Sequence, residues 1–280
     1  MSSKLAEWGK PVFAGILALV LVIASPVESA RAEASVEEAT KTVFITGSNR
    51  GIGIGFVKHY SEAGWRVIAT ARAPDRADEL NSLAAERSNI IVEQLDVTDH
   101  KGIEALAKKY EGQAIDLLIN NAGMKPANTD PEVDYKRART MFEVNTFGPV
   151  KIFESFYPHV KSSGEKKVVN ISSVIGSIGG GPAMPFMHNY RASKAALNAY
   201  MRGLSYGTKD DGVIVVLMHP GRVDVSGKTA CQEDGGAPAG QYASLCVRDS
   251  ISMMAQTIGS LDMEDNGEFF NVTPGQQLPW

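Results

Sequence analysis

Short apolar runs alternate with longer amphipathic segments from residue 41 to the end of the chain. Six of the runs are rich in Val, Ile and Leu and show little alternation of polar and apolar positions. That pattern is typical of parallel strands that are buried on both faces of a sheet. Together with a shorter seventh run, they predict strands at residues 42–46, 66–70, 90–94, 115–119, 167–171, 213–218 and 268–270.

Amphipathic segments long enough to form helices lie between these strands. We expect helices at residues 51–63, 101–110, 139–160, 192–209 and 243–260. Regular alternation of strands and helices predicts an α/β fold of the Rossmann type. This is a single domain with a doubly wound parallel sheet of about seven strands between two layers of helices. Ligands of such sheets bind at the carboxyl ends of the strands.

The N-terminal segment follows a different pattern. Residues 12–24 are apolar throughout and follow Lys4 and Lys10, and the small residues after them include the pattern Ala30-Arg31-Ala32. This arrangement indicates a signal peptide or a membrane anchor, and the short length of the run favours the signal peptide. We therefore expect residues 1–40 to be a targeting or anchoring segment with a polar tether that could contact a membrane, and residues 41–280 to be the folded domain.

Charge and cysteine content narrow the classes of partner. The formal net charge is −4 in a chain of which 44% is hydrophobic and 21% charged, so the chain is an ordinary globular protein without a basic surface, and we expect no nucleic-acid partner. The two cysteines, Cys231 and Cys246, form no CxxC motif and no Cys/His cluster, so we expect no metal site. We expect two free thiols, with a single disulfide as the alternative in an oxidising compartment.

A glycine-rich turn, residues 46–53 (TGSNRGIG), lies directly between the first strand and the first helix. Glycines at such a turn let backbone N–H groups approach a pyrophosphate at the N-terminus of a helix. The strand before it and the helix after it make a dinucleotide the expected ligand. The residues of this turn that we expect to contact the cofactor are Gly47, Ser48, Asn49, Arg50, Gly51, Ile52 and Gly53.

The end of the second strand indicates which dinucleotide is bound. NAD enzymes usually place an acidic residue there to hold the ribose 2′-hydroxyl group. This chain has Arg72 at the end of that strand and Arg50 inside the glycine-rich turn. Because a guanidinium can bind a 2′-phosphate through two hydrogen bonds, we expect NADP(H) in preference to NAD(H).

Tyr190 and Lys194 are four residues apart at the start of a predicted helix and therefore share one face of it. A nearby ammonium group, together with an oxidised nicotinamide, is expected to lower the pKa of the tyrosine, which could then exchange a proton with a carbonyl or alcohol oxygen. Tyr157 and Lys161 have the same spacing. They lack a strand-end serine upstream, whereas Tyr190 follows the fifth strand and the pair Ser172-Ser173. Of the two serines we favour Ser173 as the donor to a substrate oxygen.

From residue 41 onward the chain resembles the short-chain dehydrogenase/reductase family, and within it the C-factor and Sniffer-like carbonyl reductases. The motifs that carry the resemblance occur in the family's order along the chain. They are the glycine-rich turn, Leu95-Asp96-Val97, Asn120-Asn121-Ala122-Gly123, Asn145, Ser173, Tyr190, Lys194, Pro220-Gly221 and the C-terminal residues 266–271 and 278–280.

The resemblance implies roles for individual residues. Asn145, Ser173, Tyr190 and Lys194 would form the catalytic tetrad, with Asn145 holding a water of the proton relay and Lys194 also binding the nicotinamide ribose. Further cofactor contacts are implied for Asp96, Val97, Asn121, Ala122, Gly123, Tyr190, Pro220, Gly221 and Val223.

The resemblance also makes predictions about loops and assembly. Residues 226–240 would form a mobile lid over the substrate, and residues 176–188 make a longer loop than is usual in the family. Val225 stands where many members have a threonine that contacts the nicotinamide, and we expect Trp280 to be a packing anchor. A homodimer or homotetramer through the helices near 139–160 and 192–209 is a family expectation.

These observations predict an NADP(H)-dependent oxidoreductase that transfers a hydride between nicotinamide and a carbonyl or alcohol substrate. The alternative is a dinucleotide-binding regulator or sensor with little turnover. The substrate itself is not indicated by the sequence. The compartment also stays open, because Glu28, Glu33, Glu37 and Glu38 after the apolar run favour translocation, whereas the enzyme needs a supply of nicotinamide cofactor. Membrane association, an organelle or the secretory pathway, and the cytoplasm are the alternatives.

Overall fold

The central sheet runs in the order β3-β2-β1-β4-β5-β6-β9, and each of its strand pairings is parallel. The computed structural model describes residues 40–125, 133–182, 185–235 and 243–280. The strands are β1 (Thr42–Ile45), β2 (Arg66–Ala71), β3 (Ile90–Gln94), β4 (Leu117–Asn120), β5 (Lys167–Ile171), β6 (Ile214–Met218) and β9 (Phe269–Phe270).

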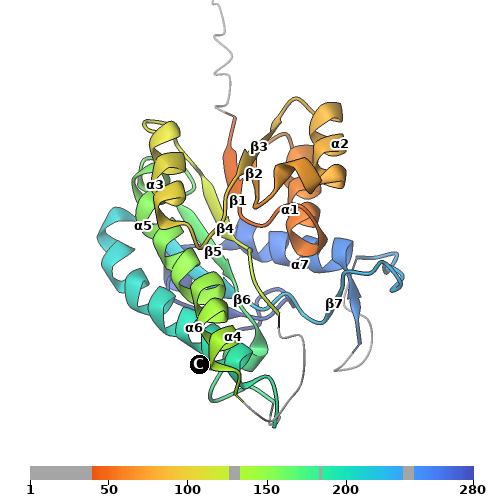
Figure 1. The fold of residues 1–280 in the computed structure, drawn as a ribbon, viewed down its shortest axis with the longest axis vertical. Coiled ribbons are helices and arrows are strands. Elements are labelled where there is room, and N and C mark those ends of the chain that lie inside the picture. Colours follow the sequence, from red (N-terminus) through yellow and green to blue (C-terminus); the bar gives the residue numbers. More distant parts are fainter. Residues whose placement is uncertain (1–39, 126–132, 183–184, 236–242) are drawn as a thin grey trace, which may run out of the picture. The chain divides into compact units, whose positions relative to one another are not determined.

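Helices cover both faces of this sheet (Figure 1). One face carries α1 (Gly51–Glu62), α2 (Asp78–Glu86) and α7 (Val247–Ser260), and the other carries α3 (His100–Lys109), α4 (Tyr135–Phe142), α5 (Gly148–Lys161) and α6 (His188–Thr208).

Each face of the sheet has its own buried apolar cluster. Successive side chains of a strand point to opposite faces, so Ile45 joins the cluster beneath α1 and α7 while its neighbour Phe44 packs on Phe156 of α5. Burial on both faces explains the unbroken apolar runs in the sequence. The expected fold class, a Rossmann-type three-layer α/β/α domain, is confirmed.

The prediction of one helix over residues 139–160 is wrong. Helix α4 begins earlier, where the side chain of Asp134 accepts a hydrogen bond of 3.0 Å from the backbone N–H of Arg137. A π-helical turn, Glu143–Phe147, then separates α4 from α5. A hydrophobic pattern does not reveal such a turn, because the added residue shifts the helix face without breaking the apolar run.

Other elements were missed or begin elsewhere than predicted. Helix α2 is absent from the predicted elements, and α6 begins at His188 and not at the predicted residue 192. The residue before it, Met187, has a left-handed conformation with φ of +61°. The catalytic candidates Tyr190 and Lys194 therefore lie in the first two turns of α6.

A small parallel pair of strands, β7 (Val223–Asp224) and β8 (Leu245–Cys246), lies outside the main sheet. Cys246 ends this pair, and its sulfur is bonded to that of Cys231. The expectation of two free thiols is therefore wrong. The spacing of the two cysteines could not reveal the bond. They are 15 residues apart in the sequence, and only the folded chain brings them together.

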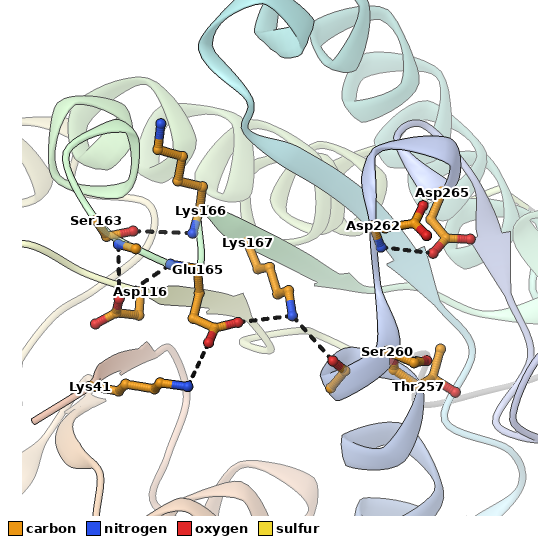
Figure 2. Close-up of polar contacts among 12 residues, drawn as sticks. Lys41, Asp116, Ser163, Glu165, Lys166, Lys167, Thr257, Ser260, Asp262 and Asp265 are labelled. Carbon is orange, nitrogen blue, oxygen red and sulfur yellow. Dashed lines mark hydrogen bonds and ion pairs between the residues drawn. The ribbon is translucent and has the colours of Figure 1, made fainter. Parts of the chain in front are cut away.

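Polar side chains tie the amino ends of the strands together (Figure 2). Glu165 accepts from Lys41 at 2.6 Å and from Lys167 at 3.0 Å, and the Lys167 ammonium also donates to the carbonyl of Gly259 at 3.5 Å. The carboxylate of Asp116 accepts from the backbone N–H of Thr42 at 2.8 Å. These contacts anchor the start of β1 at the edge of the sheet opposite the carboxyl ends.

The N-terminal apolar run and its cleavage pattern lie outside the described residues. Among the helices that the structure describes, none combines the length and apolar composition that crossing a membrane requires.

We predict that Glu165→Gln lowers the free energy of unfolding by about 1 kcal/mol at pH 7, a small value because the ion pairs are partly exposed. The lysines hold the pKa of Glu165 below its usual range. A carboxylate with a lowered pKa in the folded state contributes stability above its unfolded pKa and loses it as the pH falls through the folded value. Urea unfolding at pH 7 and near pH 4 is the measurement. The difference in free energy of unfolding between the wild type and the Glu165→Gln variant should be smaller near pH 4.

Glu79→Gln is the matched control, since Glu79 pairs with Lys58 at 2.7 Å on an exposed surface. It should change stability little at either pH. An equal loss from both substitutions would contradict a special role for the Glu165 network.

Candidate active site

The glycine-rich turn after β1 forms an anion cradle at the start of α1. Gly47 and Gly51 have φ of +67° and +58°, a region that favours glycine. A Cβ atom on Gly53 would lie 2.1 Å from the carbonyl oxygen of Gly47, so only glycine fits there. The cap residue Arg50 makes no side-chain cap, and the first turn of α1 has no acidic residue. Its backbone N–H groups therefore suit a phosphate.

The turn after β4 is bonded directly to this cradle. The hydroxyl oxygen of Thr46 accepts from the backbone N–H groups of Asn121 and Ala122, both at 3.0 Å. The side-chain amide of Asn121 donates to the carbonyls of Thr46 at 2.8 Å and Gly47 at 3.0 Å. Because β1 and β4 are neighbours at the point where the strand order reverses, this is where a doubly wound sheet binds its ligand.

The two arginines predicted to hold a 2′-phosphate lie in the connections that follow two adjacent strands of the sheet. Arg50 follows β1 and Arg72 follows β2, and both are exposed. Neither has an ion-pair partner among the described residues. After β3, the Asp96 carboxylate accepts from the backbone N–H and hydroxyl of Thr98, which shapes the turn that includes the buried Val97.

Tyr190 and Ser173 meet at the carboxyl end of β5. Ser173 is the second residue after the strand, and its side chain lies close to that of Tyr190 from α6. Burial raises the pKa of Tyr190, and the Ser173 contact only partly offsets this. The lowering expected from a neighbouring ammonium is therefore absent in the protein alone, because desolvation of the phenolate is the larger effect.

Lys194 lies one turn further along α6 and is almost fully buried. Its ammonium donates to the carbonyl of Ile171 at 2.8 Å and lies 3.9 Å from the position that a Cβ of Gly123 would take. Burial lowers the pKa of Lys194 to about 8. The lysine therefore stands between the end of β5 and the turn that follows β4.

Asn145 comes from the π-helical turn and is fully buried. Its amide group donates to the hydroxyl of Ser193 and the carbonyl of Met124, both at 3.0 Å, and its oxygen accepts from the N–H of Met124 at 2.7 Å. The carboxamide thus joins the turn after β4 to the catalytic helix. A relay water on Asn145, which stays a prediction, would have to use the main chain.

Ser172, the other strand-end serine, and the pair Tyr157 and Lys161 make contacts away from Tyr190. The Ser172 hydroxyl donates to Asn198 at 2.6 Å, behind the strand end. Tyr157 donates to Asp211 at 2.6 Å, and Lys161 pairs with the same carboxylate at 2.8 Å. Desolvation and this carboxylate raise the pKa of Tyr157 to about 12.

The turn after β6 also lies at the carboxyl edge of the sheet, and it contains Pro220 and Gly221. Gly221 has φ of +79°, and the hydroxyl of Ser250 donates to the carbonyl of Pro220 at 2.7 Å. The turn leads through Val223 into β7. Val225, which replaces the usual threonine, has a methyl carbon 3.1 Å from the position of a Cβ on Gly51. Val225, which directly precedes the predicted lid, thus lies beside the phosphate cradle.

Sequence reasoning missed Asp224, which shapes this segment. Its carboxylate accepts from the backbone N–H groups of Ser226, Lys228 and Thr229 at 2.8 to 3.1 Å. An Asp two residues before a Ser is a recognisable turn signal and could have indicated it. Residues 236–240 of the predicted lid lie outside the described residues.

The C-terminal tryptophan has the packing role that we predicted. The Trp280 ring lies 5.8 Å from that of Phe269 and is covered by the guanidinium of Arg202 at 4.4 Å.

Burial of Lys194 should cost stability, and we predict that Lys194→Met makes the fold more stable by roughly 1–2 kcal/mol at pH 7. A buried lysine with a lowered pKa binds fewer protons than in the unfolded chain between about pH 8 and 10.5, so the native protein gains stability as the pH rises through that window. Urea unfolding at pH 7 and 9.5 is the measurement. The free energy of unfolding of the Lys194→Met variant should exceed that of the wild type by less at pH 9.5 than at pH 7. A less stable variant at both pH values would contradict this account.

Comparison with known proteins identifies the family. The short chain dehydrogenase family matches residues 41–235. An uncharacterized oxidoreductase of Schizosaccharomyces pombe is 33% identical over 86% of this chain and 98% of its own length. NADPH-bound carbonyl reductase from chicken fatty liver has a similar structure, with a TM-score of 0.75 and 32% identity over 86% of this chain and 94% of the other. The structure of Sniffer, a carbonyl reductase of Drosophila melanogaster, is similar too, with a TM-score of 0.74 and 29% identity. The match covers 86% of this chain and 100% of Sniffer. The chain therefore belongs to the short-chain dehydrogenase family, and it is an oxidoreductase similar to carbonyl reductases.

Proposed function

We propose that this protein is an NADP(H)-dependent carbonyl reductase in which Tyr190 is the acid and base. The observation that carries the proposal is the meeting of Ser173, Tyr190 and Lys194 at the carboxyl end of β5, beside an uncapped phosphate-binding turn. A carbonyl oxygen held by the two hydroxyls would lie where a bound nicotinamide can reach its carbon. When bound, the cofactor supplies the hydride.

Tyr190 gives a proton to the substrate oxygen in the direction of reduction. Since burial raises its pKa, the phenol is protonated at neutral pH and ready to donate. Ser173 donates a hydrogen bond to the same oxygen and stabilises the charge that develops there. In the oxidation of an alcohol the same groups act in reverse.

Lys194 stabilises the phenolate that is left when Tyr190 has given its proton. Its pKa of about 8 keeps the ammonium charged at neutral pH, in a site where low polarity strengthens its effect. Asn145 supports this arrangement by holding Met124 and Ser193, which flank the site on two sides.

NADP(H) is the proposed cofactor in preference to NAD(H). The exposed Arg50, at the start of α1, and the exposed Arg72, directly after β2, suit a 2′-phosphate dianion. The similar chicken carbonyl reductase has NADPH bound, and a 26% identical Burkholderia multivorans member has NADP bound.

Two further parts of the proposal rest on the sequence pattern. We assign residues 1–40 to targeting or anchoring and residues 41–280 to the catalytic domain. Determining the mature N-terminus of the native protein would test this assignment.

We also propose that a homodimer or homotetramer forms through the face of α5 and α6. Phe147 and Tyr200 are exposed on this face, and the centroids of their rings lie 6.2 Å apart.

We expect Tyr190→Phe to lower kcat by at least about a thousandfold and to leave the Kd for NADPH nearly unchanged, because only the transferable proton is lost. The assay is NADPH oxidation with a panel of aldehydes, ketones and quinones.

Tyr157→Phe is the matched control, because Tyr157 and Lys161 repeat the same spacing away from the site. Its kcat should match that of the wild type. A fully active Tyr190→Phe variant would rule out the mechanism. A wild-type protein that binds NADPH and turns over none of the panel would instead favour a sensor.

Arg72→Ala should weaken NADPH binding by about tenfold and NADH binding by less than twofold, because the lost ion pair involves only the 2′-phosphate. Kd values for both cofactors provide the measurement. Lys108→Ala, which removes an exposed cation of α3, serves as the control for general charge effects. Equal losses for NADPH and NADH in the Arg72 variant would count against the 2′-phosphate assignment.

A further inference from the structure

The lid segment, which we define as residues 225–235, is held by polar contacts and by a disulfide. The Asp224 carboxylate organises its first turn through the N–H groups of Ser226, Lys228 and Thr229. The carboxylate of Asp249, which is buried in the first turn of α7, accepts from the N–H of Gln232 at 2.6 Å, and the Arg248 guanidinium donates to the carbonyl of Gln232. A covalent bond joins Cys231 to Cys246.

This segment begins beside the phosphate cradle. A methyl carbon of Val225 lies 3.1 Å from the position that a Cβ on Gly51 would take, and Val225 precedes Cys231 by six residues. A chain this short transmits the position of Cys231 to Val225, since the Asp224 turn already orders most of the residues between them. A change at the disulfide therefore changes the freedom of the residues that lie against the cofactor site.

The bond is also accessible to a reagent from solution. Cys231 is exposed, whereas Cys246 is buried at the start of α7. Thiol–disulfide exchange begins with the attack of a thiolate on an accessible sulfur, so exposed disulfides are the more readily reduced ones. The chain has no other cysteine, and the bond has no competing thiol within the protein.

We propose that Cys231–Cys246 is a thiol–disulfide exchange site whose redox state sets the affinity for the dinucleotide. A dithiol reductant attacks Cys231 through one thiolate, the Cys231–Cys246 bond breaks, and Cys246 leaves as a thiolate that takes up a proton. The second thiol of the reductant then displaces Cys231 and closes the reductant's own disulfide. Two electrons and two protons pass to the protein.

The direction of the effect follows from preorganisation. The intact bond holds the lid segment beside the cradle before the dinucleotide arrives, so less ordering is needed on binding. Reduction removes one restraint and leaves the Asp224 and Asp249 contacts, so the effect on affinity is moderate. By linkage, a bound dinucleotide must favour the disulfide by the same factor by which the disulfide favours the dinucleotide.

The test rests on the proposed cofactor and uses the full chain with NADP⁺, which binds without supplying electrons. We expect the Kd for NADP⁺ to rise about fivefold after reduction with dithiothreitol, at the lower end of typical couplings between sites. In a dithiothreitol redox buffer, saturating NADP⁺ should shift the equilibrium towards the disulfide by the same factor. EDTA is present throughout, because the ligand atoms of Cys231, Cys246 and Asp249 lie within 4.8 Å of one another and could hold a metal once reduced.

A readout without cofactor separates this inference from the proposed function. Trypsin should cleave after the exposed Lys228 several-fold faster in the reduced protein than in the oxidised one. The Cys231→Ser/Cys246→Ser variant is the control: dithiothreitol should change neither its cleavage rate nor its Kd, and both values should match those of the reduced wild type.

The outcomes are distinct. A reduced protein with an unchanged Kd and an unchanged cleavage rate would overturn the inference, as would two free thiols per chain after equilibration with oxidised glutathione. Absence of NADP⁺ binding in both redox states would contradict the proposed cofactor, and faster cleavage after Lys228 on reduction would still support control of the lid segment by the disulfide.

Discussion

The hydrogen bonds between Thr46 and Asn121 are the constraint on which the site depends. They join the turns after β1 and β4, the two strands at which the sheet reverses its order. Through Met124 and Asn145 the same connection reaches Ser193 on the catalytic helix. The glycine-rich turn and the face of α6 that carries Ser193 are thus parts of one bonded framework, and a shift in either would have to break these hydrogen bonds.

One of the proposed catalytic groups is costly for the fold. An ammonium that is buried, as that of Lys194 is, is less stable than an apolar side chain would be in the same place. The apolar clusters on the two faces of the sheet and the polar network at its amino edge offset that cost. These stabilising contacts lie away from the carboxyl edge of the sheet, where we place the active site.

Much of the site could be predicted because its signals are local. The glycine-rich turn joins a strand to a helix, and Tyr190 and Lys194 are one helical turn apart. The same spacing also occurs at Tyr157 and Lys161, and a strand-end serine upstream was the feature that separated the two pairs. The structure is consistent with this difference, since the Ser173 side chain lies close to that of Tyr190, whereas the Asp211 carboxylate accepts from Tyr157 and pairs with Lys161. The turn that the Asp224 carboxylate forms with Ser226 is a local signal as well, although the prediction did not include it.

The sequence by itself determined the strand pattern, the fold class, the phosphate cradle and the choice of Tyr190, because apolar periodicity and short motifs act within one or two elements. Only the tertiary structure decided the Cys231–Cys246 bond, the π-helical turn that carries Asn145, and the direction in which the pKa of Tyr190 moves. Two of these depend on segments distant in sequence, because β7 pairs with β8 and the phenol of Tyr190 is buried between α6 and the end of β5. The π-helical turn is local, but its Asn145 bonds Ser193 of α6. Such non-local packing leaves no periodic mark in the chain.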